Sequence, residues 1–160
     1  MIRIILPLAI VAAMFLGPMY SYPSDNPVSG RSEQSIVTGD KFIGGVINCV
    51  RKLEIPLGKD CASEAVINNS KLPSQAMSLA AIISLAAAVI GIFGVLPFVG
   101  RLTSVVTMVA GLSVLGAMGL FLVTMMGTKT GLPAVQWGAY LTAGVALITT
   151  ISGLSGMRGR

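Results

Sequence analysis

The chain has 160 residues, of which 54% are hydrophobic and only 11% are charged, and its mean hydropathy is +0.84. An ordinary soluble domain carries about 25% charged residues, so this composition excludes that class and indicates a membrane protein. The net charge of +5 is not gathered into a run of Lys and Arg with interleaved aromatic residues, which excludes a basic nucleic-acid-binding stripe.

Residues 4–20 form a short apolar run that follows Arg3. A charged start before an apolar run is also typical of a signal peptide, but no small-residue cleavage motif follows, so we expect the first membrane helix here. Pro18 is expected to end this helix. Tyr20 and Tyr22 are expected to lie at the membrane interface, where aromatic residues are enriched.

The long polar segment is residues 21–75, which we expect to form an extracellular loop. Residues 35–38 and 41–43 have the composition of two strands, and Gly39-Asp40 between them predicts a turn. Further extended segments follow, so the sequence predicts a small antiparallel sheet of three or four strands within this loop.

Cys49 and Cys61 are the two cysteines of the chain and are separated by 11 residues of the polar loop. Such a pair indicates a disulfide on the oxidising side of the membrane, with two free thiols as the alternative. A closed loop of this length contributes roughly 3 kcal/mol to stability in the chain-entropy estimate. Asn68 begins an Asn-Asn-Ser glycosylation sequon, whose alternative is a chance triplet that is not used.

Three long uncharged runs follow the loop, and each exceeds the ~20 residues that span a membrane. We expect membrane helices over 76–98, 103–126 and 134–155, with a short second loop over 127–133. Together with the first helix, these runs predict a mainly α protein. Its single membrane domain over 1–160 would be a four-helix bundle bearing a small antiparallel β ectodomain.

Small residues recur in the predicted helices, where they let helix backbones approach closely. We interpret them as packing positions within the bundle, and contact with a second subunit is the alternative. The candidate positions are Ala80, Ser84, Ala88, Gly91, Gly111, Gly116 and Gly119.

With four spans, the two termini share one side of the membrane. Arg3, Arg101, Arg158 and Arg160 would lie together on that side, which the positive-inside rule assigns to the cytoplasm. The long loop is then extracellular.

Several short motifs resemble the claudin family of four-span membrane proteins, both in their residues and in their order along the chain. The first cysteine follows Gly45, Val46, Ile47 and Asn48, where the family has a Gly-Leu-Trp signature, so the chain resembles a divergent member. The other matching motifs are Gly17-Pro18-Met19-Tyr20, Ile36-Val37-Thr38, Leu72-Pro73-Ser74-Gln75-Ala76, Leu132-Pro133 and Gly138-Ala139-Tyr140-Leu141.

The resemblance implies a cell-contact protein of the plasma membrane. Such a protein forms a paracellular barrier or pore by self-assembly through its extracellular loops. Arg51 and Lys52 are candidate pore or partner charges, which predicts a preference for anions. Their alternative is a solvated pair that Glu54 balances. The alternative function is an accessory subunit of a channel, a receptor or another membrane complex, and a structural subunit of a larger assembly is a third hypothesis.

The chain contains no histidine, and no acidic residue lies in a predicted span. It therefore lacks the usual general base and proton relay, and its two cysteines are too few for a zinc site. We expect no enzyme activity, no catalytic residue, no metal, no cofactor and no small-molecule substrate. Ser and Thr in the spans are expected to bond to the helix backbone. The expected partners are membrane lipid and either further copies of the chain or a larger membrane protein.

Overall fold

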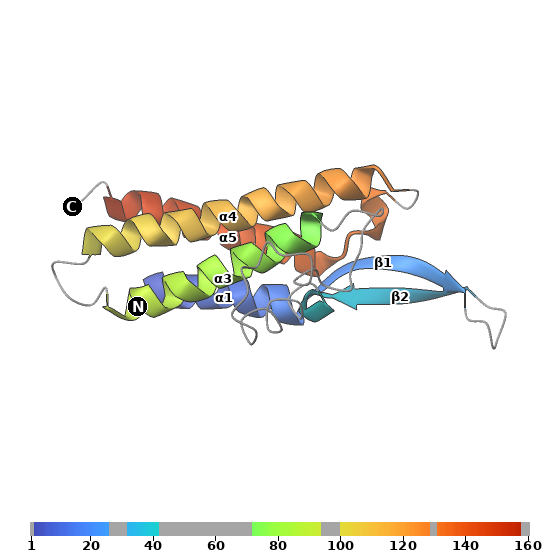
Figure 1. The fold of residues 1–160 in the computed structure, drawn as a ribbon, viewed down its shortest axis with the longest axis horizontal. Coiled ribbons are helices and arrows are strands. Elements are labelled where there is room, and N and C mark those ends of the chain that lie inside the picture. Colours follow the sequence, from blue (N-terminus) through green and yellow to red (C-terminus); the bar gives the residue numbers. More distant parts are fainter. Residues whose placement is uncertain (1, 26–31, 42–71, 94–99, 129–130, 158–160) are drawn as a thin grey trace.

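The computed structural model describes residues 2–25, 32–41, 72–93, 100–128 and 131–157. These residues form four α-helices, one short 3₁₀ helix and a sheet of two antiparallel strands (Figure 1). In chain order the elements are α1 Ile2–Leu16, β1 Pro18–Asp25, β2 Ser32–Thr38, α3 Leu72–Phe93, α4 Gly100–Met126, η2 Leu132–Ala134 and α5 Trp137–Met157.

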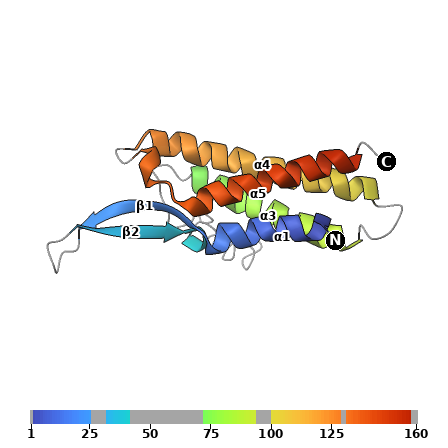
Figure 2. The same ribbon diagram turned by 180° about the vertical axis from the view of Figure 1, so that it is seen from behind.

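The four α-helices lie side by side as an elongated bundle, and the β1–β2 hairpin projects from one end of it (Figures 1 and 2). Helix α4 packs against α3 and α5, and α1 packs against the same two helices from the other side. The start of α1 and the end of α5 lie at the end of the bundle opposite the hairpin.

Three helices in the described part of the chain are long and apolar enough to cross a membrane, namely α3, α4 and α5. They indicate a membrane protein. Helix α1 is also apolar but has only 15 residues. At 1.5 Å per residue it covers about 22 Å, less than the ~30 Å of a hydrocarbon core.

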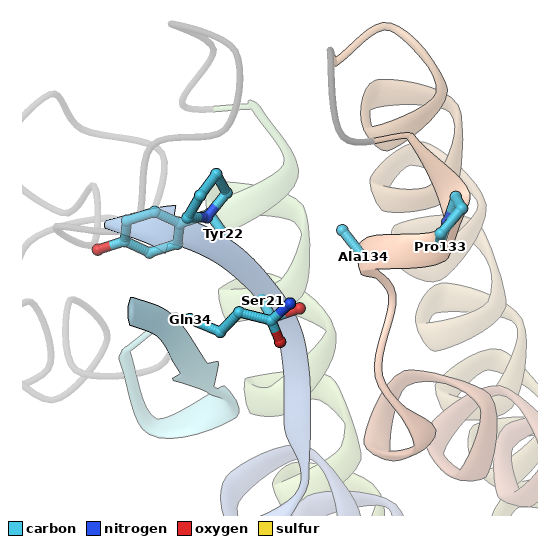
Figure 3. Close-up of a pocket in the computed structure, with 6 residues that line it drawn as sticks. Ser21, Tyr22, Gln34, Pro133 and Ala134 are labelled. Carbon is cyan, nitrogen blue, oxygen red and sulfur yellow. The ribbon is translucent and has the colours of Figure 1, made fainter. Parts of the chain in front are cut away.

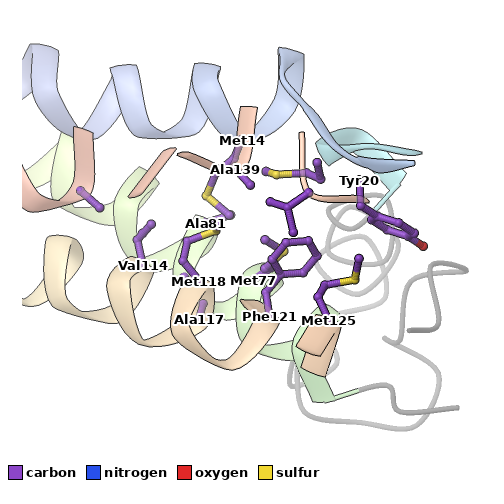
Figure 4. Close-up of a cluster of buried hydrophobic side chains, with 14 of the residues drawn as sticks. Met14, Tyr20, Met77, Ala81, Val114, Ala117, Met118, Phe121, Met125 and Ala139 are labelled. Carbon is purple, nitrogen blue, oxygen red and sulfur yellow. The ribbon is translucent and has the colours of Figure 1, made fainter. Parts of the chain in front are cut away.

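The largest buried side chains gather at the hairpin end of the bundle (Figure 4). Five methionines and one phenylalanine from α1, β1, α3 and α4 are almost fully buried there: Met14, Met19, Met77, Met118, Met125 and Phe121. An unbranched thioether side chain fills irregular space, which suits a place where helices, a strand and a loop converge.

Hydroxyl side chains occupy the buried interior of the bundle, and several bond to their own helix as expected. Ser84 donates to the carbonyl of Ala80 at 2.8 Å, and Thr107 donates to that of Thr103 at 2.7 Å. Thr142 and Thr149 make the same bond one turn back in α5. Each bond gives a hydroxyl group a hydrogen-bond acceptor within its own helix.

The predicted end of the first membrane helix is wrong. Helix α1 ends at Leu16, and β1 begins two residues later at Pro18, so residues 18–20 are extended. Proline is disfavoured inside a helix, and the β1 backbone finds hydrogen-bond partners in β2. The helix therefore ends four residues before the expected residue 20, and β1 starts immediately at the end of the bundle.

The predicted turn at Gly39-Asp40 is also wrong, because residues 39–41 are helical. The strand expected over 35–38 is present within β2, but its partner is β1, with Tyr20 opposite Val37 and Tyr22 opposite Ser35. In the described part of the chain the sheet has two strands, and the further segments expected to extend it lie outside the described residues.

The other predicted helices are present with shifted ends. Helix α3 begins at Leu72, four residues before the predicted start, with Pro73 in the first turn, where a missing N–H is tolerated. The expected continuation over 94–98 lies outside the described residues. Helix α4 extends the expected 103–126 by three residues, and α5 begins at Trp137 because η2 occupies residues 132–134.

Candidate functional site

The first strand and the segment before α5 are joined at the end of the bundle. The backbone N–H of Gln136 donates to the carbonyl of Met19 at 2.9 Å, and its side-chain Nε2 donates to Ser21 Oγ at 3.2 Å. A single β-bridge pairs Tyr20 with Val135. We call Gly17, Tyr20, Ser21, Gln136 and Gly138 the hairpin base, because these residues attach the hairpin to the bundle.

Two glycines allow the closest approach in the hairpin base. A side-chain carbon at Gly138 would lie 2.7 Å from the Cα of Gly17 and 2.5 Å from the carbonyl oxygen of Pro18. The end of α1 and the start of α5 are therefore in backbone contact. The Gly17 carbonyl also accepts a hydrogen bond of 3.2 Å from the N–H of Gly39, which ties the end of β2 to the same point.

Tyr20 fills the space between the hairpin and the helices. Its side chain is only 8% exposed, and its ring centroid lies 6.2 Å from that of Phe121 and 6.1 Å from that of Tyr22. Burial raises the pKa of the Tyr20 phenol above its usual value, and the charge of the neighbouring Tyr22 adds to the increase. The expectation that Tyr20 lies in an interfacial aromatic belt is wrong, because the residue belongs to the core.

A pocket of about 200 Å³ opens beside the hairpin base (Figure 3). Ser21, Tyr22 and Gln34 come from the hairpin, and Pro133 and Ala134 of η2 lie across from β1. Pro23 completes the lining. The lining thus combines the hydroxyl-bearing Ser21 and Tyr22 and the amide-bearing Gln34 with apolar proline and alanine side chains, which suit hydrogen bonding and apolar contact. No group of three or more His, Cys, Asp or Glu residues is placed to hold a metal within the described residues.

The sequence-predicted loop residues lie outside the described residues. They are Cys49 and Cys61, the signature residues Gly45, Val46, Ile47 and Asn48, the charged pair Arg51 and Lys52, and the sequon residue Asn68. Their proposed pairing and roles stay predictions.

The small residues chosen as packing positions fall into two groups. Ala80, Ser84, Ala88 and Gly91 are buried on α3. On α4, a side-chain carbon at Gly111 would lie 2.8 Å from both the Ala146 carbonyl oxygen and the Thr150 nitrogen of α5.

Gly116 and Gly119, by contrast, are exposed on the outside of α4. A side-chain carbon at either would meet no atom within 4 Å. These two residues therefore present a small surface to whatever surrounds the bundle, and they do not bring helices of this chain together.

The hairpin base has no signature of its own in the sequence. The sequence predicts a helix through Gly17, and Gln136 and Ser21 belong to no motif. Their contacts join residues 115 positions apart, so no local pattern indicates them. The available signal was Gly17-Pro18, a dipeptide that favours a break in a helix.

No protein-family model, curated protein or solved structure matches this chain.

Proposed function

We propose that the chain is a divergent claudin-like cell-contact protein that forms a paracellular barrier or pore by self-assembly through its extracellular loops. In this proposal α1 is a fourth membrane span. The hairpin and second loop face the extracellular side, and both termini face the cytoplasm.

One observation carries the proposal: the hairpin rises directly from the end of the bundle and is tied to the second loop. The bonds from Gln136 to Met19 and Ser21 hold β1 against the segment that follows η2. Parts of the two loops therefore form one surface of fixed geometry, which this proposal places beside the membrane. Assembly through two loops requires such a surface, because a contact between ordered groups avoids the entropy of ordering them on binding.

The helix order supports the fourth span. The start of α1 lies at the same end of the bundle as the end of α5, and α1 packs on both α3 and α5 (Figure 2). An apolar helix that packs against two candidate membrane-spanning helices is well placed to cross the same layer. Neighbouring protein and local bilayer adjustment both compensate for its modest length.

A mixed culture of expressing and non-expressing cells tests the proposed function. The protein is expected to concentrate only where two expressing cells meet, because each loop surface needs a copy on the opposite membrane. Even distribution over the whole surface would contradict the adhesion role. Recovery of one larger membrane protein with the chain from such cells would instead support the accessory-subunit alternative.

A further inference from the structure

Two aromatic side chains stand exposed on the first turn of α5, next to the hairpin base. Trp137 is 60% exposed and Tyr140 is 56% exposed. They are three residues apart and so share one face of the helix. Trp137 is the single tryptophan of the chain.

The same face of α5 is mainly apolar as far as Leu154. It exposes Leu141, Leu147, Ile148, Ile151 and Leu154. Indole and phenol rings are amphipathic, with an apolar ring and one polar N–H or O–H group. An exposed Trp–Tyr pair at the end of a long exposed apolar stripe is the arrangement found where a membrane helix meets the lipid headgroups.

The contact between Gly17 and Gly138 relates the depth of the aromatic pair to that of the end of α1. Gly138 follows Trp137 directly, and its backbone touches the end of α1. The point where α1 ends and β1 begins therefore lies at the depth of the aromatic pair. Gln136, Ser21 and the pocket lie on the hairpin side of that level.

We propose that Trp137 and Tyr140 bind the lipid headgroup region on the hairpin side of the membrane, and that they set the hydrocarbon boundary at the first turn of α5. The partner is the bilayer surface itself. This inference concerns depth in the membrane and does not depend on the proposed cell-contact function.

The single tryptophan makes the depth measurable in the full-length protein. The chain is reconstituted into phosphatidylcholine vesicles in which the acyl chains are brominated either near the carbonyl end or near the methyl end. Bromine quenches tryptophan emission on contact. The proposal predicts a larger loss of Trp137 emission with the shallow bromine than with the deep bromine.

A matched control moves the reporter along the same face. Ile148 is 55% exposed and lies 11 residues further along α5, about 16 Å deeper at 1.5 Å per residue. In the Trp137→Phe, Ile148→Trp variant the order of quenching should reverse.

Two results would overturn the proposal. If deep bromine quenches wild-type Trp137 as strongly as shallow bromine, the start of α5 lies inside the hydrocarbon. If neither bromine quenches it while aqueous iodide does, the residue stands in water above the headgroups. Because the decisive measurement uses the unmodified chain, misfolding of a variant does not affect it.

Discussion

Gly17 and Gly138 are in backbone contact, although 120 residues of sequence separate them. This contact joins the last turn of α1 to the first turn of α5. It leaves no room for a side chain on either residue, and it fixes the point at which the hairpin leaves the bundle.

Replacing Gly138 with alanine is therefore expected to destabilise the protein. The added carbon would press on the carbonyl oxygen of Pro18 and on the Gly17 backbone, and overpacking of this kind costs about 1–3 kcal/mol. Thermal unfolding in detergent micelles measures the loss. Gly144→Ala is the matched control, because Gly144 lies on the same helix and a carbon there would meet no atom within 4 Å. Equal stability of the two variants would contradict the contact.

The Gln136 side chain is expected to hold β1 in place. Gln136→Ala removes the bond to Ser21 Oγ, and Ser21 is a buried residue only 8% exposed, so the loss should cost about 1 kcal/mol. Amide hydrogen exchange in β1 should become faster, while exchange in α4 should not change. Gln34→Ala is the control, since Gln34 is an exposed glutamine that also lines the pocket. Faster β1 exchange in both variants would remove the special role of Gln136.

Tyr20 should make stability fall at high pH. Its folded-state pKa lies above the unfolded value of 10.0, so the stabilisation from the neutral buried phenol is fully present below pH 10. It is lost as pH rises through the raised pKa, because the phenolate must then be buried. The ultraviolet absorbance of phenolate, measured against pH, follows the titration. The rise in absorbance at the highest pH should be missing in Tyr20→Phe. An unchanged upper part of the curve in that variant would contradict the burial of Tyr20.

Cys49 and Cys61 are expected to be disulfide-bonded. Neither thiol should react with a maleimide before reduction, and both should react afterwards. Replacing both cysteines with serine should lower stability by about 3 kcal/mol, as loop closure predicts. Reaction of both thiols in the unreduced protein, purified without reductant, would show that the pair is free.

If the protein forms a pore, Arg51 and Lys52 should set its preference for anions. Reversing both charges to glutamate should lower chloride permeability relative to sodium across a cell layer that expresses the protein. Lys41→Glu is the control, because Lys41 is an exposed lysine close to the hairpin base. A selectivity that changes equally with the control would assign the effect to overall loop charge instead of to this pair.

The helices of this chain were largely predictable, because long uncharged runs need only composition to be recognised. The start of α5 shifted by three residues, since the local geometry of Leu132–Ala134 is set by the bond from the Val135 N–H to the Leu132 carbonyl. The partner of β2 is not predictable, because the apolar run that ends at Tyr20 predicts a helix and no local pattern pairs Tyr20 with Val37. The hairpin base depends on contacts such as Gly17 with Gly138, which are decided by packing between distant segments.

The outward-facing Gly116 and Gly119 show the same limit. Their sequence spacing resembles that of any packing motif, but burial separates them from Gly111, which lies against α5. The spacing of small residues along the sequence indicates only that a helix has a face lined by small side chains. Which face meets another helix depends on where the neighbours lie.

Freeze-fracture imaging of cells that express the chain, and that otherwise lack such junctions, tests self-assembly most directly. We expect continuous intramembrane strands wherever two expressing cells touch. Membrane particles that remain dispersed at those contacts, with the protein present at the surface, would contradict it.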